Sequence, residues 1–248
     1  MPLSISLVPC LDDNYGFLVR DEKTGTTAAV DTPDAGPILD ALQERGWALD
    51  IILNTHKHGD HIGGNQALRD RTGATVVGPG EVAERTHVDW VVKGGDRLSL
   101  GSTELFVIDT GGHTFGHVSY YAPDAETVFV GDTLFAMGCG RLFEGTADQM
   151  WTSLSRLAAL PPETRVYCAH EYTLANADFA LSVDDSAAVA ERAAAVLEAR
   201  ALGQATVPTT VGLELQTNPF LRAPALRPSL EPADAFGEIR RAKDGFTG

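Results

Sequence analysis

The stretch that decides the fold is Thr55-His56-Lys57-His58-Gly59-Asp60-His61, which follows the apolar run Ile51-Ile52-Leu53 after one residue, Asn54. It places three imidazoles and a carboxylate in a loop at the end of a strand. His56 and His58 can turn toward one point. Asp60 and His61, where the loop enters a helix, face a neighbouring point, so the four side chains suit two adjacent metal ions better than one. A solvated polar loop is the simpler interpretation, but chance produces this pattern in about one of a few thousand such chains.

The other candidate ligands also lie just past apolar strand runs. They are His117 after residues 105–108, Asp132 after residues 128–130, and His170 after residues 166–168. Loops that leave neighbouring strand ends gather at one edge of a sheet, where small-molecule sites are built. We expect His113 and Asp31 to support these ligands rather than bind metal. His87, far from any of these motifs, is interpreted as an ordinary surface histidine.

Short β-branched and aromatic runs fill the first two-thirds of the chain and predict strands. The runs are residues 5–8, 17–19, 27–30, 51–53, 75–77, 105–108, 118–121, 128–130 and 166–168. Helical patterns fall at about residues 37–45, after Asp60, and at 147–160. The economical solution is an α/β layered fold in which sheet packs on sheet with helices outside.

The strand signals stop beyond about residue 170. Residues 185–202 form an alanine-rich amphipathic pattern that Gly203 closes, which predicts a helix. Residues 208–232 are rich in proline and predict loop with short helical turns. The tail is therefore expected to be a helical appendage.

Composition limits the cellular compartment and the binding partners to be expected for this chain. The 248 residues can bury a sizeable core without disulfides, and three cysteines with no C-x-x-C spacing are typical of reduced thiols. The chain shows neither a signal peptide nor a long apolar run, so we expect a cytoplasmic protein. A formal net charge of −15 disfavours nucleic acid and membrane as partners.

The motifs T-H-x-H-x-D-H, G-H-T-x-G-H, G-D-T and A-H-E-Y resemble those of the metallo-β-lactamase superfamily. The chain is most similar to the glyoxalase II branch, the hydroxyacylglutathione hydrolases, and the likeness includes residues 8–15, 138–146, 217–222 and 240–244. The resemblance implies a four-layer αββα sandwich that binds metal over residues 1–170. It also implies a mostly helical substrate-binding domain over residues 171–248.

The resemblance also implies how two divalent ions are shared among seven ligands. One ion is bound by His56, His58 and His117, the other by Asp60, His61 and His170, and Asp132 bridges them. Spacing alone supports the set, while the partition comes from the family. Asp60 and Asp132 are the implied catalytic carboxylates. Zinc is the leading metal, although iron and manganese use the same ligand types.

The implied reaction is hydrolysis of S-D-lactoylglutathione to D-lactate and glutathione by a monomer. Arg240 and Lys243 are implied to pair with the glycine carboxylate of glutathione, and Arg141 and Tyr172 to contact the rest of it. Without the family, the cations of residues 240–243 would be interpreted as a solvated helix end. Arg141 and Phe143 stand where some members carry Lys and Tyr, so the implied contact of Phe143 lacks a hydroxyl.

Four alternatives share parts of this pattern. A mononuclear iron persulfide dioxygenase of the same fold also uses glutathione conjugates, but it needs fewer ligands than the seven found here. A β-lactamase does not use this bridging aspartate. An RNA-processing nuclease is disfavoured by the acidic composition, and a non-catalytic metal-binding scaffold gives no reason for the glutathione-type tail.

Overall fold

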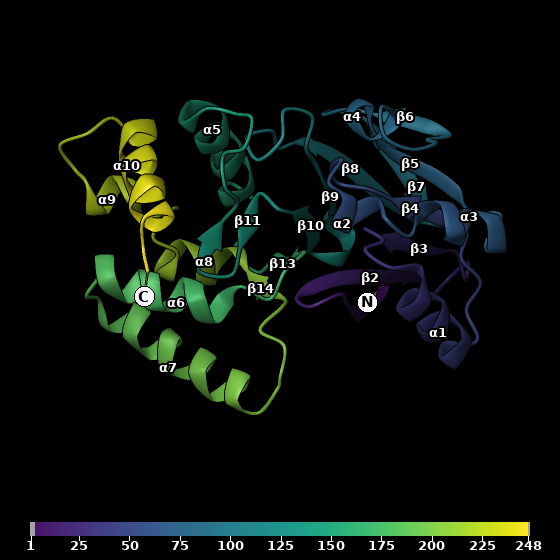
Figure 1. Ribbon diagram of the computed structural model, residues 1–248, viewed down its shortest axis with the longest axis horizontal. Coiled ribbons are helices and arrows are strands. Elements are labelled where there is room, and N and C mark those ends of the chain that lie inside the picture. The colour runs from purple at the N-terminus through teal and green to yellow at the C-terminus, as the bar shows by residue number, and fades with distance from the viewer. Residues whose placement is uncertain (1–2, 248) are drawn as a thin grey trace. The chain divides into compact units, whose positions relative to one another are not determined.

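The computed structural model describes residues 3–247, which fall into two compact units (Figure 1). Unit 1 comprises Met1–Asp109 and Gly116–Gly131, and unit 2 comprises Thr110–Phe115 and Asp132–Gly248. Across residues 3–247, every helix is too short or too polar to span a bilayer.

The first sheet of unit 1 carries the strand ends on which the candidate ligands depend. Its strands, in spatial order, are β1 (Leu3–Cys10), β2 (Asn14–Asp21), β3 (Thr27–Val30), β4 (Ile51–Leu53), β5 (Thr75–Pro79) and β6 (Trp90–Val92). β1, β2 and β3 pair antiparallel, whereas β3 to β6 pair parallel. Because parallel strands end at the same edge, the segments that follow β3, β4 and β5 are brought together there.

Helices α1 (Ala35–Arg45) and α3 (Asn65–Thr72) cover one face of this sheet. Two short helices, α2 (Gly59–Ile62) and α4 (Gly80–Ala83), follow the ends of β4 and β5. Leu18 and Ile52 of the sheet share an apolar cluster with Ile38 of α1 and Leu68 of α3, and all four side chains are fully buried. α1 begins at Asp34, whose carboxylate accepts the Gly36 N–H, and such a cap satisfies a donor that the first turn leaves free.

Four antiparallel strands pack on the other face. They are β7 (Arg97–Leu100), β8 (Thr103–Asp109), β9 (Val118–Ala122) and β10 (Thr127–Gly131), with a short 3-10 turn, η1 (Pro123–Ala125), between the last two. The Phe17 and Phe129 rings meet at 5.7 Å, and the Tyr120 hydroxyl donates to the Asn54 carbonyl at 2.7 Å. Unit 1 is thus built from a helix layer and two sheet layers.

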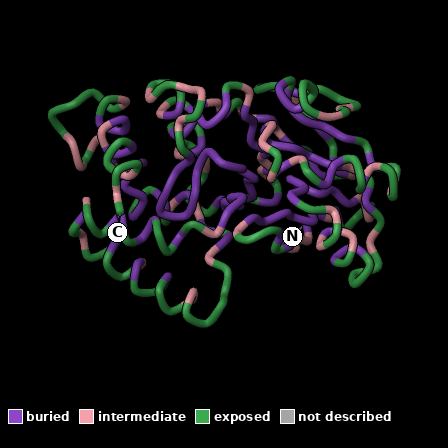
Figure 2. The backbone as a smooth tube through the Cα atoms, viewed as in Figure 1, coloured by how far each residue is buried: buried purple, intermediate pink, exposed green. Residues whose placement is uncertain are grey.

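Unit 2 contains two small strand pairs and most of the helices. Its elements are β11 (Leu134–Phe135), β12 (Gly138–Cys139), α5 (Ala147–Ala158), β13 (Arg165–Cys168), α6 (Thr173–Val183), α7 (Ala187–Ala201), β14 (Thr209–Thr210), α8 (Val211–Thr217), α9 (Ala223–Leu226) and α10 (Pro232–Asp244). α6 packs along α7, and α10 packs on α5 and α9 (Figure 1). The rings of Phe179, Phe220 and Phe236 fill its core. Figure 2 shows much of the α7 backbone coloured as exposed, in keeping with its alternating burial.

All nine predicted strand runs are confirmed, as are the helices at residues 37–45, 147–160 and 185–202. The expected helix after Asp60 is two helices, α2 and α3. Gly64 lies between them, and a Cβ built on it would lie 2.8 Å from the Ala35 backbone nitrogen. The chain can therefore pass this close to Ala35 only at a glycine. The expectation that strands end near residue 170 is wrong at Thr209–Thr210, because β14 pairs antiparallel with β13.

Candidate metal centre

The loop after β4 gathers imidazole rings in unit 1. The His56 and His61 side chains are fully buried, with ring centroids 4.0 Å apart, and His117 stacks on His56 at 4.8 Å. His58 meets His56 edge-on, with its Nδ1 3.0 Å from His56 Nε2. Ligand atoms of Asp60 and His61 lie within 4.8 Å of one another. Of the five predicted ligands of unit 1, four lie in the segment after β4, and the fifth, His117, just before β9, stacks on one of them.

Asp31, just past β3, orients two of these rings. Its Oδ2 accepts from His61 Nδ1 at 2.9 Å and from the Thr55 hydroxyl at 2.8 Å. Because that hydroxyl has one proton, its lone pair accepts the His56 Nδ1 proton at 3.1 Å. Both rings then carry the proton on Nδ1 and keep Nε2 for coordination. The expected supporting role of Asp31 is confirmed.

Two further supports in unit 1 were missed as individual residues. Asn14 donates its amide to the Asp60 carboxylate at 3.1 Å and to the Asp60 carbonyl at 3.2 Å. Glu81 of α4 accepts the backbone N–H groups of Lys57 and Gly116. Asn14 lies within the N-terminal stretch that resembles the family, but neither residue belongs to a metal motif, so spacing gave no signal for them.

In unit 2, Asp132 lies between two histidines. Its Oδ1 is 3.4 Å from His170 Nε2, and its Oδ2 is 3.4 Å from His113 Nε2. His113 Nδ1 lies 2.9 Å from the Arg141 carbonyl, which can only accept, so this nitrogen carries the proton. The bond to Arg141 braces the loop while Nε2 stays available as a ligand atom, so the supporting role expected for His113 stays a prediction. His87 is confirmed as a surface histidine, half-exposed and paired with Asp89.

The donor set fits a divalent metal ion. Two nitrogens bound at about 2.0–2.1 Å to one tetrahedral ion lie about 3.3 Å apart, close to the 3.0 Å between the facing nitrogens of His56 and His58. Neutral imidazoles with fixed tautomers and nearby carboxylates are ligands that zinc, iron and manganese accept. The His56 and His61 rings also have the hydrogen-bond support that coordinating histidines require.

The predicted substrate-binding residues all lie in unit 2. The Tyr172 ring stacks on His170 at 4.6 Å with 7° between the planes, and Phe143, 63% exposed, lies 5.1 Å from His113. Arg141 is exposed. Lys243 donates to the Ala175 carbonyl at 2.6 Å, and burial together with Arg240 and Arg141 lowers its pKa.

Arg240 lies deeper than a solvated helix end would. Its side chain is buried, donates to the Cys139 carbonyl at 3.0 Å and pairs with Asp244 at 2.8 Å. The guanidinium carbon also lies 5.0 Å from the Phe220 ring centroid. The solvated interpretation is wrong for this residue, because the α10 face that carries it packs into the helical core.

Comparison with known proteins assigns the layered sheets and their histidine-bearing loops to the metallo-beta-lactamase superfamily. Residues 23–170 match the metallo-beta-lactamase superfamily, and residues 171–246 match the hydroxyacylglutathione hydrolase C-terminus. A hydroxyacylglutathione hydrolase of Rhizobium meliloti is 51% identical, over 98% of this chain and 99% of that protein. The chain therefore belongs to the hydroxyacylglutathione hydrolase family.

Solved structures support the fold. ETHE1 from Myxococcus xanthus superposes with a TM-score of 0.72 at 28% identity, over 97% of this chain and 90% of that one. TTHA1623 in a di-iron-bound form superposes with a TM-score of 0.65 at 26% identity, over 86% of this chain and 98% of that one. The predicted metallo-β-lactamase fold with a helical C-terminal part is confirmed.

Proposed function

We propose that this protein hydrolyses glutathione thioesters, converting S-D-lactoylglutathione to D-lactate and glutathione with two divalent metal ions. The observation that carries the proposal is family membership along the whole chain, joined to an imidazole cluster whose tautomers are set for coordination. The C-terminal match favours hydrolysis over the dioxygenase alternative, because it extends through the segment that carries the predicted glutathione contacts.

We assign one ion to His56, His58 and His117, and the second to Asp60, His61 and His170, with Asp132 shared. Residues 1–170 hold the metal ligands and residues 171–248 complete the substrate site. The shared role of Asp132 follows from the family resemblance; its carboxylate offers two oxygens, and Oδ1 lies 3.4 Å from Nε2 of the assigned ligand His170. Bound divalent ions lower the pKa of water and polarise a carbonyl oxygen, which is the chemistry that hydrolysis requires.

The remaining steps need little from the protein. Water adds to the thioester carbonyl carbon and releases its two protons to solvent, the carbon–sulfur bond breaks, and D-lactate and the thiolate of glutathione leave; the thiolate then takes up a proton from solvent. A thiolate is a good leaving group, so a strong general acid is dispensable. Asp60 is held by Asn14 at two points, which fixes its carboxylate beside His61. The three cysteines are buried, and burial raises the pKa of Cys139 to about 11 and of Cys168 to about 12. These thiols stay protonated at neutral pH and are therefore unsuited to act as nucleophiles.

Substrate recognition has to attract an anionic tripeptide to a chain of net charge −15. We assign this to the cations of unit 2. Arg141 and Lys243 lie near enough for their charges to interact, and Arg240 lies one turn of α10 from Lys243. Tyr172 contributes its hydroxyl and Phe143 an exposed apolar surface. Local positive charge raises the concentration of an anionic ligand even on an acidic protein.

We further propose zinc as the metal, with iron as the main competitor, and a cytoplasmic monomer. The neighbour TTHA1623 was solved with two irons, so iron deserves a direct test. Buried, unpaired cysteines are in keeping with a reducing compartment.

The deciding experiment is hydrolysis of S-D-lactoylglutathione by the purified protein before and after chelation, with elemental analysis of the same sample. We expect about two metals per chain, activity that chelation abolishes, and recovery when metal is returned. Oxygen uptake with glutathione persulfide tests the dioxygenase alternative. Hydrolysis that survives complete removal of metal would overturn the proposal, as would oxygen uptake without thioester hydrolysis.

A further inference from the structure

Glu81 links the two loops of unit 1 that carry three proposed ligands. It is the second residue of α4, directly past the end of β5, and its side chain is buried. Oε1 accepts the Lys57 N–H at 3.3 Å, and Oε2 accepts the Gly116 N–H at 2.7 Å. Lys57 stands between His56 and His58, and Gly116 directly precedes His117. One carboxylate thus spans both loops, with one oxygen for each.

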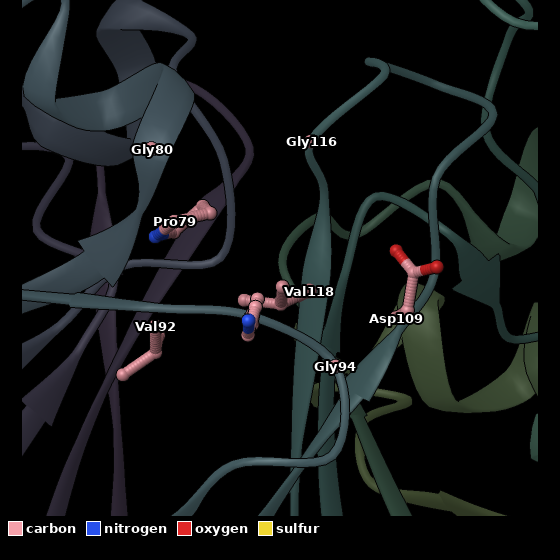
Figure 3. A pocket seen from close by; sticks show the side chains of 8 residues that line it. Pro79, Gly80, Val92, Gly94, Asp109, Gly116 and Val118 are labelled. Atoms are coloured by element: carbon pink, nitrogen blue, oxygen red, sulfur yellow. The ribbon is translucent and has the colours of Figure 1, made fainter.

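The backbone on either side of the Glu81–Gly116 hydrogen bond is not packed against protein everywhere. Gly116 and Gly80, the residue before Glu81, both line a cavity of about 350 Å³ together with Val92, Gly94 and Val118 (Figure 3). This cavity is open to solvent, so protein atoms do not pack against that side of either glycine. A backbone bond from the Val118 N–H to the Thr55 carbonyl at 2.9 Å also joins the two loops. Hydrogen bonds to a charged acceptor are about twice as strong as neutral ones, so the Glu81 carboxylate adds a strong second link between them.

Gly116 is also fitted to the carboxylate. A Cβ built on Gly116 would lie 2.8 Å from Glu81 Oε2, closer than real Cβ contacts. The close approach of backbone and carboxylate therefore requires the absence of a side chain. This gives a second and independent way to disturb the same link.

We propose that Glu81 is a positioning residue that holds the His56–His58 loop and the His117 loop at the separation required by one metal ion. The inference rests on the ligand assignment of the proposed function. Glu81 is not among the proposed metal ligands. It acts on ligand geometry through the backbone, in the way that supporting hydrogen bonds around metal sites tune affinity.

The test titrates the full-length, zinc-loaded protein with a chromophoric chelator and counts the zinc retained at each step. We expect Glu81→Ala to release one zinc per chain at about 10- to 100-fold lower chelator concentration than the wild type. Glu81→Gln keeps one acceptor oxygen and should shift in the same direction by less. Gly116→Ala should reproduce Glu81→Ala, whereas Glu84→Gln, a change of the exposed neighbour on the same helical segment, should match the wild type.

Circular dichroism and the melting temperature separate positioning from a purely structural role. Zinc release at wild-type chelator concentration by folded Glu81→Ala, even with a lowered melting temperature, would overturn the inference. Should Glu81→Ala not fold, Glu81→Gln and Gly116→Ala decide by the same criterion. If the wild type holds zinc but does not cleave thioesters, only the proposed function is refuted. The zinc titrations would still test the positioning role of Glu81.

Discussion

Replacing Asp31 by Asn should change the protonation pattern of a metal ligand while the fold is kept. Asp31 has a φ of 51°, a left-handed conformation that Asn tolerates as well as Asp, so the substitution adds no backbone strain. An Asn oxygen can keep the Thr55 N–H bond at 2.9 Å. Its amide then faces His61 Nδ1, and two donors cannot bond each other. His61 is expected to move its proton to Nε2, the nitrogen that should bind metal.

The size of the effect follows from the lost bond. A hydrogen bond to a charged group contributes about 1.5–3 kcal/mol, and restoring the coordinating tautomer would cost about that much. At about 1.4 kcal/mol per tenfold, metal binding should weaken about 10- to 150-fold. Asp31→Ala is a poorer probe because it leaves three buried donors without an acceptor, and each unsatisfied donor lowers the free energy of unfolding by about 1–3 kcal/mol. That sum approaches the whole stability of a typical domain.

Two measurements on the full chain check this reasoning. Chelator titration should show metal released more easily from both sites of Asp31→Asn, because the Thr55 hydroxyl that sets the His56 tautomer loses the same acceptor oxygen as His61. ¹⁵N NMR of the metal-free protein should show the His61 ring proton on Nε2. Asp40→Asn, on the exposed surface of α1, serves as the matched control. Wild-type metal retention by Asp31→Asn, or an unchanged ring tautomer, would refute the argument.

Three other changes have distinct signatures. Lys243→Ala should raise KM for a glutathione thioester about 2- to 5-fold, in line with about 0.5–1 kcal/mol for a partly exposed pair, with kcat within a few-fold in steady-state assays. Asp132→Ala should lose metal by elemental analysis and at least about 100-fold in activity; a variant with two metals and normal turnover would remove the bridging assignment. Asp21→Asn should flatten the acid limb of the stability profile: burial acts to raise the pKa of Asp21, but bonds from Thr103, Thr24 and Ser102 outweigh it and hold the pKa well below its usual value. The stabilisation from this carboxylate is present above about pH 4 and is lost as the pH falls further, which melting curves between pH 2 and 7 would show.

The sequence predicted the strands of unit 1 because they are short and buried. Residues 27–30 are buried throughout, and a run with no exposed position is readable without knowing its partners. The ligand loop could also be predicted from the sequence, since His56, His58 and His61 are close in sequence and follow one strand. Their partition between two ions was not readable from spacing, because it depends on which ring nitrogen faces which neighbour.

Supports that act across long sequence separations could not be predicted. Glu81 reaches Lys57 across 24 residues and Gly116 across 35, and Asn14 reaches Asp60 across 46. A side chain that accepts a backbone N–H leaves no mark on the residue that donates it, since every residue but proline has one. The burial of Arg240 was missed for a similar reason. Its charge predicts solvent, while the Cys139 carbonyl that accepts its proton lies about a hundred residues earlier.

Each half of the proposed ligand set is supported from within its own unit. In unit 1, Asp31 and Thr55 orient the His56 and His61 rings, and Glu81 spans the loops of His56 and His117. In unit 2, the Arg141 carbonyl fixes His113, which in turn faces Asp132. Ligands that are oriented before the metal arrives lose little rotamer freedom when they bind it, and each ordered side chain spared is about 0.5–1.5 kcal/mol retained for affinity. The hydrogen bonds behind the ligands should therefore govern how tightly metal is held, even where the ligand residues are unchanged.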